Sequence, residues 1–295
     1  MCVYVYVCVN HSNHLSLVCF LFLFKRMMIY FSRSFVSQSV TKLAITSRIP
    51  SLTSAFQYHS RFMMSTIGNP KVELDNYDQG QVELLNEKCI LVDQNDEVVG
   101  SESKKACHLM ANINKGLLHR AFSVLIFNSK NEFLLTQRSD KKITFPGYYT
   151  NTCCSHPLYT PLEMEQSDAI GVKRAAQRRL HLELGINPLE IPLSEMKFMT
   201  RFLYKASSND VWGEHEIDYA LIIHRDVAIN PDPDEVKSYR FISRHELLPF
   251  LDAENAKGSP TTPWFRIMLE KFFFKWWDNL DNLDQFVEPN KLYGL

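Results

Sequence analysis

Alternating and clustered apolar residues predict a set of strands after residue 80. Residues 89–92 and 97–100 read as a short hairpin through a turn of Asp and Asn residues. A stronger hairpin signal joins residues 122–127 to residues 133–137 through a polar five-residue connection. Two later strands are predicted, over residues 197–205 and 216–224.

The clearest helical pattern follows Ser167 and Asp168, which we expect to cap the helix. Gly185 closes this pattern at the position after the last helical turn. A short helix is predicted over residues 244–251, and an aromatic helix over residues 264–279 begins behind a proline. The apolar positions of the first helix are spaced i, i+3, i+7 and i+11: Ala169, Val172, Ala176 and Leu180.

Strands and helices therefore alternate irregularly, and the predicted fold class is α/β, more narrowly α+β, as a mixed sandwich in one domain. The chain has 295 residues, 45% of them hydrophobic, with a net charge of −1. Residues 1–72 lack acidic residues and carry seven basic ones, so residues 73–295 have a net charge of −8. A folded part with this charge argues against a nucleic-acid partner. We expect a leader over residues 1–72 and the folded domain over residues 73–295.

The leader has two readings. Residues 25–64 are rich in Ser, Thr and Arg, as in a mitochondrial transit peptide. The second interpretation is an untranslated or alternative first exon, because translation could start at Met27, Met28, Met63 or Met64. The apolar run at residues 15–24 is half the length of a membrane span, so no span is predicted. The protein is expected to be a monomer.

The cysteines indicate a reducing compartment. Cys153 and Cys154 are adjacent, where a mutual disulfide would be strained. Cys89 and Cys107 have no spacing typical of a disulfide framework. We therefore predict that no disulfides form.

Residues 150–157, Thr-Asn-Thr-Cys-Cys-Ser-His-Pro, form the first segment that could carry chemistry. In an extended chain Cys154 and His156 share a face. A thiol beside an imidazole can act as a nucleophile, an acid/base pair or two metal ligands. A buried structural cysteine is the competing interpretation.

Residues 212–219, Trp-Gly-Glu-His-Glu-Ile-Asp-Tyr, form the second such segment. Glu214 and Glu216 share a strand face, where two carboxylates repel unless a cation or a shared proton relieves them. An exposed acidic edge is the alternative. Taken singly, the remaining candidates could equally be surface charges or ordinary histidines: Lys104, Arg138, Lys142, Arg179, His108 and His119.

Residues 178–186, Arg-Arg-Leu-His-Leu-Glu-Leu-Gly-Ile, resemble a degenerate Nudix box, the metal-holding helix of diphosphate-processing enzymes. Arg178, Glu183 and Gly185 fit the pattern, but Arg179 and Leu182 replace two glutamates. Diphosphate hydrolysis needs such carboxylates to collect metal ions and activate water. The resemblance thus implies a Nudix-type mixed sheet flanked by helices, without ordinary hydrolase activity.

From about Gln81 onward, these motifs and the Phe-Lys-Trp-Trp-Asp-Asn-Leu at residues 274–280 resemble the type I isopentenyl-diphosphate delta-isomerases, in their animal form. The resemblance implies an isomerase of isoprenoid and sterol biosynthesis that interconverts isopentenyl and dimethylallyl diphosphate. It implies Cys154 and Glu216 as the catalytic pair, with Tyr204 and Trp264 around the isoprene tail. It implies diphosphate contacts from Lys104, Arg138, Lys142, Ser155 and Arg179. It implies a tightly held divalent metal (Mg2+, Mn2+ or Zn2+) on His108, His119, His156, Glu214 and Glu216, and a second ion, Mg2+, at Glu183.

The resemblance also implies a cytoplasmic or peroxisomal location, although Tyr293-Gly294-Leu295 lacks the basic middle residue of a peroxisomal signal. The full-length form could instead enter mitochondria through its leader. Two rival functions remain open on the sequence, a Nudix hydrolase and a non-catalytic diphosphate-binding module. The hydrolase would need the missing box glutamates, and the non-catalytic module has little need of both Cys154 and Glu216.

Overall fold

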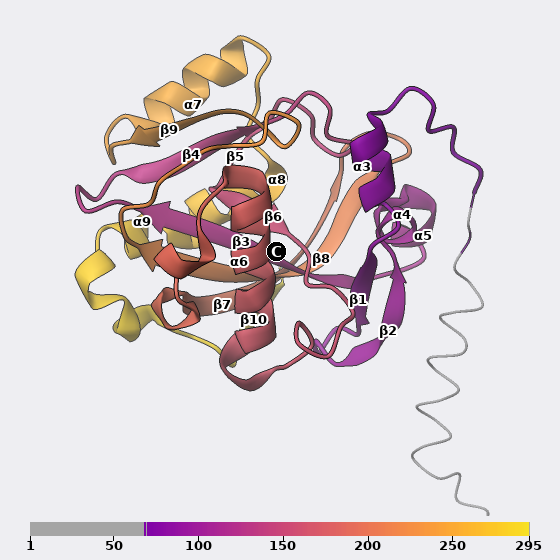
Figure 1. The fold of residues 1–295 in the computed structure, drawn as a ribbon, viewed down its shortest axis with the longest axis horizontal. Helices are drawn as coiled ribbons and strands as arrows, with labels where there is room; N and C mark the ends of the chain where they lie inside the picture. The colour runs from indigo at the N-terminus through magenta and orange to yellow at the C-terminus, as the bar shows by residue number, and fades with distance from the viewer. Residues whose placement is uncertain (1–67, 69, 295) are drawn as a thin grey trace, which may run out of the picture. The chain divides into compact units, whose positions relative to one another are not determined.

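The computed structural model describes residue 68 and residues 70–294, so nearly all of the predicted leader lies outside the described residues. In the described part, ten strands form one sheet with the path β10-β7-β8-β3-β1-β2, and β4, β5, β6 and β9 join it through β3 and β4 (Figure 1). The pairs β3·β8 and β10·β7 are parallel. The strands are β1 Lys88–Val92, β2 Val98–Ser103, β3 His119–Phe127, β4 Phe133–Arg138, β5 Tyr149–Thr150, β6 Cys153–Ser155, β7 Lys197–Ser207, β8 Gly213–His224, β9 Val236–Ile242 and β10 Leu292–Gly294.

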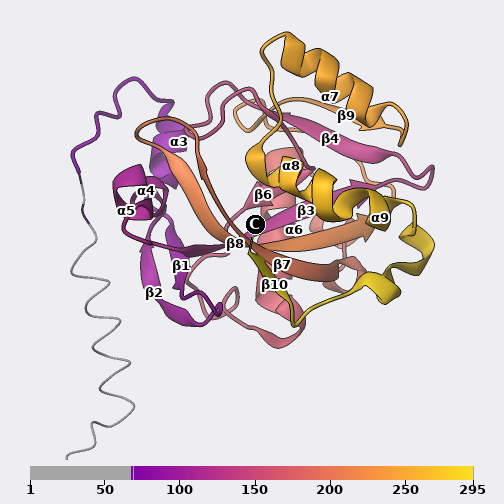
Figure 2. The same ribbon diagram turned by 180° about the vertical axis from the view of Figure 1, so that it is seen from behind.

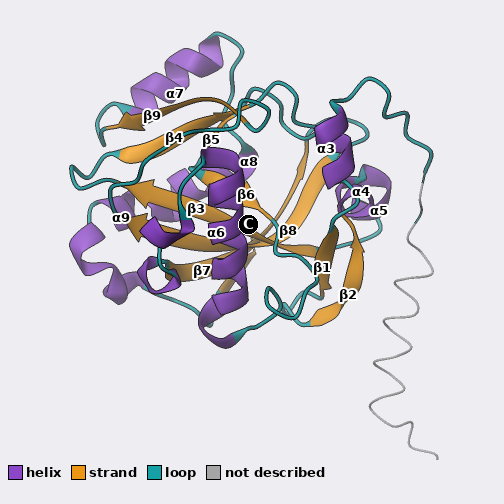
Figure 3. Ribbon diagram, viewed as in Figure 1, coloured by secondary structure: helices purple, strands orange, loops and turns teal. Residues whose placement is uncertain are grey.

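Helices cover both faces of this sheet. The long helix α6 lies in front of β3 in Figure 1, whereas α8 and α9 lie over the other face in Figure 2. The α-helices are α3 Gln79–Leu84, α4 Lys104–His108, α5 Met110–Ile113, α6 Ile170–Leu184, α7 Leu247–Ala256, α8 Pro263–Met268 and α9 Phe274–Trp277. The predicted α/β class and mixed sheet with helices are therefore confirmed (Figure 3).

Two apolar cores lie on the two faces. On one face α6 packs Val172 and Leu180 against the sheet. On the other face the C-terminal aromatic helices pack Trp264 and Phe273. Because side chains alternate along β3, Val124 belongs to the first core and Leu125 to the second.

The second predicted hairpin is only partly correct. β3 and β4 are both present, but they pair only at Phe127 and Phe133. Beyond that turn, β3 pairs along its whole length with β8, and β4 pairs with β9. A turn sequence specifies only the residues next to it, and here the long-range strand pairs decide the rest.

The predicted cap of α6 is wrong. Ser167 and Asp168 form a single 3-10 turn, and Asp168 and Ala169 both have left-handed backbone angles with φ of 51°. The Asp168 carboxylate accepts from Lys173 instead of capping the helix. Gly185 ends α6 in a left-handed conformation with φ of 65°, as predicted.

The other predicted strands and helices are present, but some of their first or last residues differ from the predicted ones. The short helix begins three residues late as α7, and the aromatic helix contains a π-helical turn, Leu269–Phe273, between α8 and α9. The four cysteines in the described part are free thiols. No helix of the described residues is long and apolar enough to cross a membrane.

Candidate active site and metal centre

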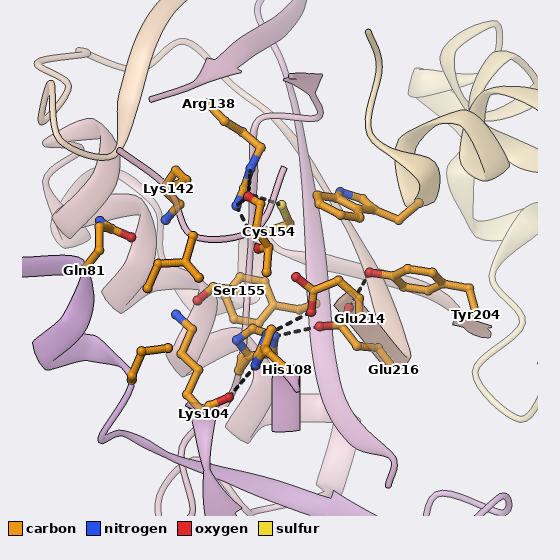
Figure 4. A pocket seen from close by; sticks show the side chains of 16 residues that line it. Gln81, Lys104, His108, Arg138, Lys142, Cys154, Ser155, Tyr204, Glu214 and Glu216 are labelled. Carbon is orange, nitrogen blue, oxygen red and sulfur yellow. Dashed lines mark hydrogen bonds and ion pairs between the residues drawn. The ribbon is translucent and has the colours of Figure 1, made fainter. Parts of the chain in front are cut away.

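A pocket opens beside α4 where β3 and β8 begin and β6 ends (Figure 4). Strand pairing brings its walls together, because β3 lies between β6 and β8. The lining combines histidines, carboxylates, cations, one thiol and the aromatic rings of Phe122, Tyr204 and Trp264. Its polar members are Gln81, Lys104, His108, Arg138, Lys142, Thr144, Cys154, Ser155, His156, Tyr204, Glu214, Glu216 and Trp264. Two segments that were separate in the sequence, residues 150–157 and 212–219, therefore meet in one site.

Three histidines and two glutamates gather at the inner end of this pocket. His108 ends α4, His119 begins β3, and His156 directly follows β6. The imidazole rings lie 4.8 to 4.9 Å apart, centre to centre. All five side chains are buried, and one ligand atom from each lies within 4.8 Å of every other.

The carboxylates lie between the imidazoles. His108 Nε2 is 2.8 Å from Glu214 Oε2. Glu216 Oε1 is 2.6 Å from His156 Nε2 and 3.2 Å from His119 Nε2. The exposed acidic edge considered from sequence is excluded, because Glu214 and Glu216 are each 4% exposed.

The donor set fits a divalent cation. Nδ1 of His119 and Nδ1 of His156 are buried without any partner among the described residues, whereas His119 Nε2 and Glu214 Oε2 are satisfied only by the contacts just given. Burying unpartnered polar atoms is costly, and a cation would satisfy several of them at once. Imidazole nitrogens with carboxylate oxygens suit Zn2+, Mn2+ and related ions.

Burial and neighbouring charges shift the pKa values within the cluster. Burial lowers the pKa of His156 well below its usual value, and the two neighbouring imidazoles lower it further. Although burial opposes it, Glu214 raises the pKa of His108 to about 9. Burial likewise opposes ionisation of Glu216, but the hydrogen bond and charge of His119 lower its pKa overall. A neutral imidazole and an ionised carboxylate are the forms that bind metal.

Cys154 and Glu216 reach the same pocket from two strands. Burial raises the pKa of Cys154 to about 12, so the side chain is a protonated thiol at neutral pH. Its Sγ lies 3.9 Å from Arg138 Nη1. Tyr204 donates a hydrogen bond of 2.5 Å to Glu216 Oε2, which fixes the carboxylate from the other side.

Cys153 points the other way. It is 1% exposed and packs in the α6 core, whereas Cys154 packs beside the aromatic core and lines the pocket. Cys154 and His156 thus share the pocket face, as predicted from alternation, and Cys153 does not.

Cations line the outer part of the pocket. Lys104, Arg138, Lys142 and Ser155 are all on its surface. Burial lowers the pKa of Lys104, and the charges of Lys142 and Arg179 lower it further. Such a concentration of like charge favours an anion.

Arg179 and Glu183 are not among the residues that line the pocket. Arg179 donates to Glu183 Oε1 over 2.7 and 2.9 Å and to Glu235 Oε2 over 3.1 Å. The two side chains are buried as an ion pair on α6, one turn apart. A direct contact of Arg179 with a ligand stays a prediction.

Trp264 is both a pocket wall and a core residue. It lines the pocket but is only 2% exposed. Its ring meets Phe145 edge-on at 5.3 Å, and the Arg138 guanidinium lies 5.7 Å from the ring centre.

Glu235 is a site residue that the sequence reasoning missed. Its carboxylate accepts from Lys142 over 2.5 Å, from Arg179 and from Gln81 over 2.8 Å. It holds two candidate anion-binding cations in place. It lies outside every motif and reaches the site only because β9 pairs with β4, so no local sequence signal could have identified it.

Comparisons with known proteins identify the family of this chain. The NUDIX domain family matches residues 117–265. Isopentenyl-diphosphate Delta-isomerase 1 of Mesocricetus auratus is 54% identical over 226 residues, which is 77% of this chain and 100% of that protein. Isopentenyl-diphosphate delta-isomerase 2 of Homo sapiens is 50% identical over 222 residues, 75% of this chain and 98% of that protein.

A plant relative and a solved structure extend the comparison. The chloroplastic Isopentenyl-diphosphate Delta-isomerase II of Arabidopsis thaliana is 52% identical over 67% of this chain and 71% of its own length. Among solved structures, DR0079 of Deinococcus radiodurans covers 63% of this chain and 99% of its own at 15% identity, with a TM-score of 0.41. On the identity and coverage of the sequence relatives, the chain belongs to the isopentenyl-diphosphate delta-isomerase family of Nudix-domain proteins.

Proposed function

We propose that this protein interconverts isopentenyl diphosphate and dimethylallyl diphosphate. The observation that carries the proposal is one pocket with a protonated thiol, an ionised carboxylate and a cationic outer part. Moving the double bond requires adding a proton at one carbon and removing one from another. Cys154 and Glu216 supply the two groups for these steps.

The proton steps need a dry pocket. Protonating an unactivated alkene leads toward a tertiary carbocation, which water would capture. Tyr204 and Trp264 close one side, and an aromatic face stabilises a desolvated cation by roughly 2 kcal/mol. Cys154 holds a proton at neutral pH, and Glu216 can accept one. Because the reaction is reversible, each group serves in both roles.

The cationic outer part anchors the diphosphate. Lys104, Arg138, Lys142 and the Ser155 hydroxyl would bind its oxygens, and this binding energy holds the tail between Cys154 and Glu216. We assign Glu183 to a Mg2+ ion shared with the diphosphate. Among the described residues no donor bonds to Glu183 Oε2, whereas Oε1 accepts from Arg179.

His108, His119, His156, Glu214 and Glu216 would hold a resident divalent metal. When bound, this cation would keep the Glu216 carboxylate ionised and fixed in orientation. Among Mg2+, Mn2+ and Zn2+, the nitrogen-rich ligand set favours Mn2+ and Zn2+.

Hydrolysis is the weaker function for this site. Arg179 and Leu182 occupy the positions of two box glutamates, so the helix lacks carboxylates that hydrolysis needs to collect metal ions and activate water. A passive diphosphate-binding module would have no use for a thiol and a carboxylate facing one cavity.

The deciding experiment incubates the full chain with isopentenyl diphosphate and Mg2+ and identifies the products. We expect dimethylallyl diphosphate without release of phosphate. Phosphate or isopentenyl monophosphate as the main product would establish a hydrolase, and unchanged substrate with measurable binding would establish a passive module.

We further propose a monomer that acts in the cytoplasm or peroxisome, with a mitochondrial form directed by the leader. A fluorescent reporter fused to residues 27–64 tests the leader. Mitochondrial fluorescence supports the transit peptide, and diffuse cytosolic fluorescence supports an alternative start.

A further inference from the structure

Asn151 lies behind the pocket with every hydrogen-bonding position of its side chain in use. It is 0% exposed and is not among the pocket-lining residues. Its Nδ2 donates to the carbonyl oxygens of Val124 over 3.1 Å and Cys153 over 2.9 Å. Its Oδ1 accepts from Trp264 Nε1 over 3.0 Å and Thr150 Oγ1 over 3.1 Å. An amide offers two donors and two acceptor lone pairs, so its capacity is filled.

These four bonds join the two walls that face the isoprene tail. The Cys153 carbonyl belongs to the peptide that leads directly into Cys154. The Trp264 indole has one N–H, and Asn151 receives it. Thr150 extends the connection, because its hydroxyl also contacts Thr262 Oγ1 at 2.8 Å and Cys154 Sγ at 4.0 Å.

We propose that Asn151 is a positioning residue that sets the distance between the Cys154 thiol and the Trp264 ring. This inference rests on the proposed isomerase function. An isoprene tail has no hydrogen-bonding group by which the protein could orient it, so the reacting carbons are placed by the walls alone. A misplacement of about 1 Å can cost about 100-fold in rate.

Lys104, Lys142 and Ser155 are separate from this connection, whereas Arg138 approaches both the Cys154 thiol and the Trp264 ring. Asn151 makes no hydrogen bond to Lys104, Lys142 or Ser155. Loss of its side chain should therefore reduce turnover while substrate binding persists.

Thr152 offers a matched control in the same segment. It is 1% exposed and joins β3 to β4, accepting from Ile126 N over 3.0 Å and donating to Leu134 O over 2.7 Å. It bonds to neither Cys153 nor Trp264. Thr152→Val thus removes a buried polar connection of the same loop without touching the two walls.

The experiment measures kcat, KM and melting temperature for the full chain, Asn151→Ala and Thr152→Val. We expect Asn151→Ala to lower kcat about 100-fold with KM changed by no more than about twofold. Thr152→Val should lower the melting temperature while retaining wild-type kcat. Equal kcat losses in both variants, or a loss confined to KM in Asn151→Ala, would overturn the positioning role.

An NMR signature separates positioning from general destabilisation. The indole N–H resonance of Trp264, assigned by its absence in Trp264→Phe, should shift in Asn151→Ala and stay in place in Thr152→Val. The Trp277 indole, which donates to Asn131 O, should be unchanged in both. An unshifted Trp264 resonance in Asn151→Ala would contradict the inference.

If Asn151→Ala does not fold, Thr150→Val replaces it as the test of the positioning role. Valine keeps the volume of threonine and removes only the hydroxyl. We expect a kcat loss in this variant with an unchanged KM, and wild-type kcat would overturn the proposal. A wild-type chain that does not isomerise isopentenyl diphosphate would overturn the proposed function itself. That result is distinct from an active wild type with an equally active Asn151→Ala.

Discussion

The adjacent residues Cys153 and Cys154 have different roles, because one packs in the core and the other faces the pocket. Cys154 faces the pocket and Cys153 is buried against α6. We expect Cys154→Ala to lower isomerisation by about 100- to 10,000-fold, the usual contribution of a positioned acid or base. Cys153→Ala should retain turnover, because it removes only a core sulfhydryl. Turnover and melting temperature of the two variants check this, and comparable losses of turnover would refute the assignment.

At this same scale, sequence reasoning found residues that lie in recognisable segments and missed those that only the fold brings in. Alternation paired Cys154 with His156 and Glu214 with Glu216, and all four line one pocket. Glu235 could not be predicted, because its role follows from charges contributed by Lys142 and Arg179 far along the chain. The role of Asn151 depends on hydrogen bonds to other elements, which a motif does not reveal.

At the element scale, the end of α6 illustrates a prediction that succeeded because its physics is local. Gly185 has a positive φ, and a Cβ there would lie 2.3 Å from the Asn230 carbonyl oxygen. Gly258 also has a positive φ of 89°, but a Cβ there would meet nothing within 4 Å. We therefore expect Gly185→Ala to destabilise by more than about 1 kcal/mol and by more than Gly258→Ala. Denaturant unfolding of both variants measures the difference, and equal losses would show that only the backbone angle matters.

Two element predictions failed, one through partners distant in sequence and one through a neighbour five residues away. The hairpin over residues 122–137 opens because β3 pairs with β8 over nine residues and β4 pairs with β9. The cap of α6 fails because Asp168 pairs with Lys173 and the chain enters the helix through left-handed residues. Tertiary strand pairing overrides the local propensity of the hairpin, whereas a local ion pair and the left-handed backbone replace the expected cap.

Glu235 connects elements whose association should depend on pH. Although burial opposes its ionisation, Lys142 and Arg179 lower its pKa below the usual 4.5. A carboxyl whose pKa is depressed in the folded state stabilises that state above its unfolded pKa. This stabilisation is lost as the pH falls from about 4.5 toward the lower folded value.

We expect Glu235→Gln to lower the free energy of unfolding near pH 7 by roughly 3 to 5 kcal/mol, the cost of breaking a buried ion pair. The gap to wild type should shrink as the pH falls below about 4.5. Denaturant unfolding of both proteins from pH 7 to pH 3 measures it. A gap that is constant over this range would argue against an ionised Glu235.

At the scale of the whole molecule, the five candidate metal ligands come from α4, β3, β8 and the residue after β6. A ligand that binds only the folded state stabilises it, by about 2.7 kcal/mol at 100 times its dissociation constant. We expect Zn2+ or Mn2+ to raise the melting temperature of chelator-treated protein. Since the pKa of His108 is about 9, binding below that pH should also release a proton. Glu214→Gln is the control, and an equal thermal shift in this variant would place the metal elsewhere.

The first described residues define how much of the chain the folded part needs. The Asn112 amide, 1% exposed, exchanges two hydrogen bonds of 2.9 Å with the backbone of Gly68, and Val72 packs beside Trp212. A chain starting at Met63 keeps these contacts, whereas a chain starting at Glu73 loses them and leaves a buried amide short of partners. Such a loss costs about 1 to 3 kcal/mol.

We therefore expect the Met63 chain to match the full chain in melting temperature and turnover, and the Glu73 chain to melt lower. Asn112→Ala in the Met63 chain removes the same bonds together with one to Ala106 O, so it should melt at least as low as the Glu73 chain. Thermal unfolding of the four proteins tests whether the folded domain includes Gly68 or begins at residue 73. If the Glu73 chain melts with the full chain, the folded domain begins at residue 73, and the contacts of Gly68 add nothing to its stability.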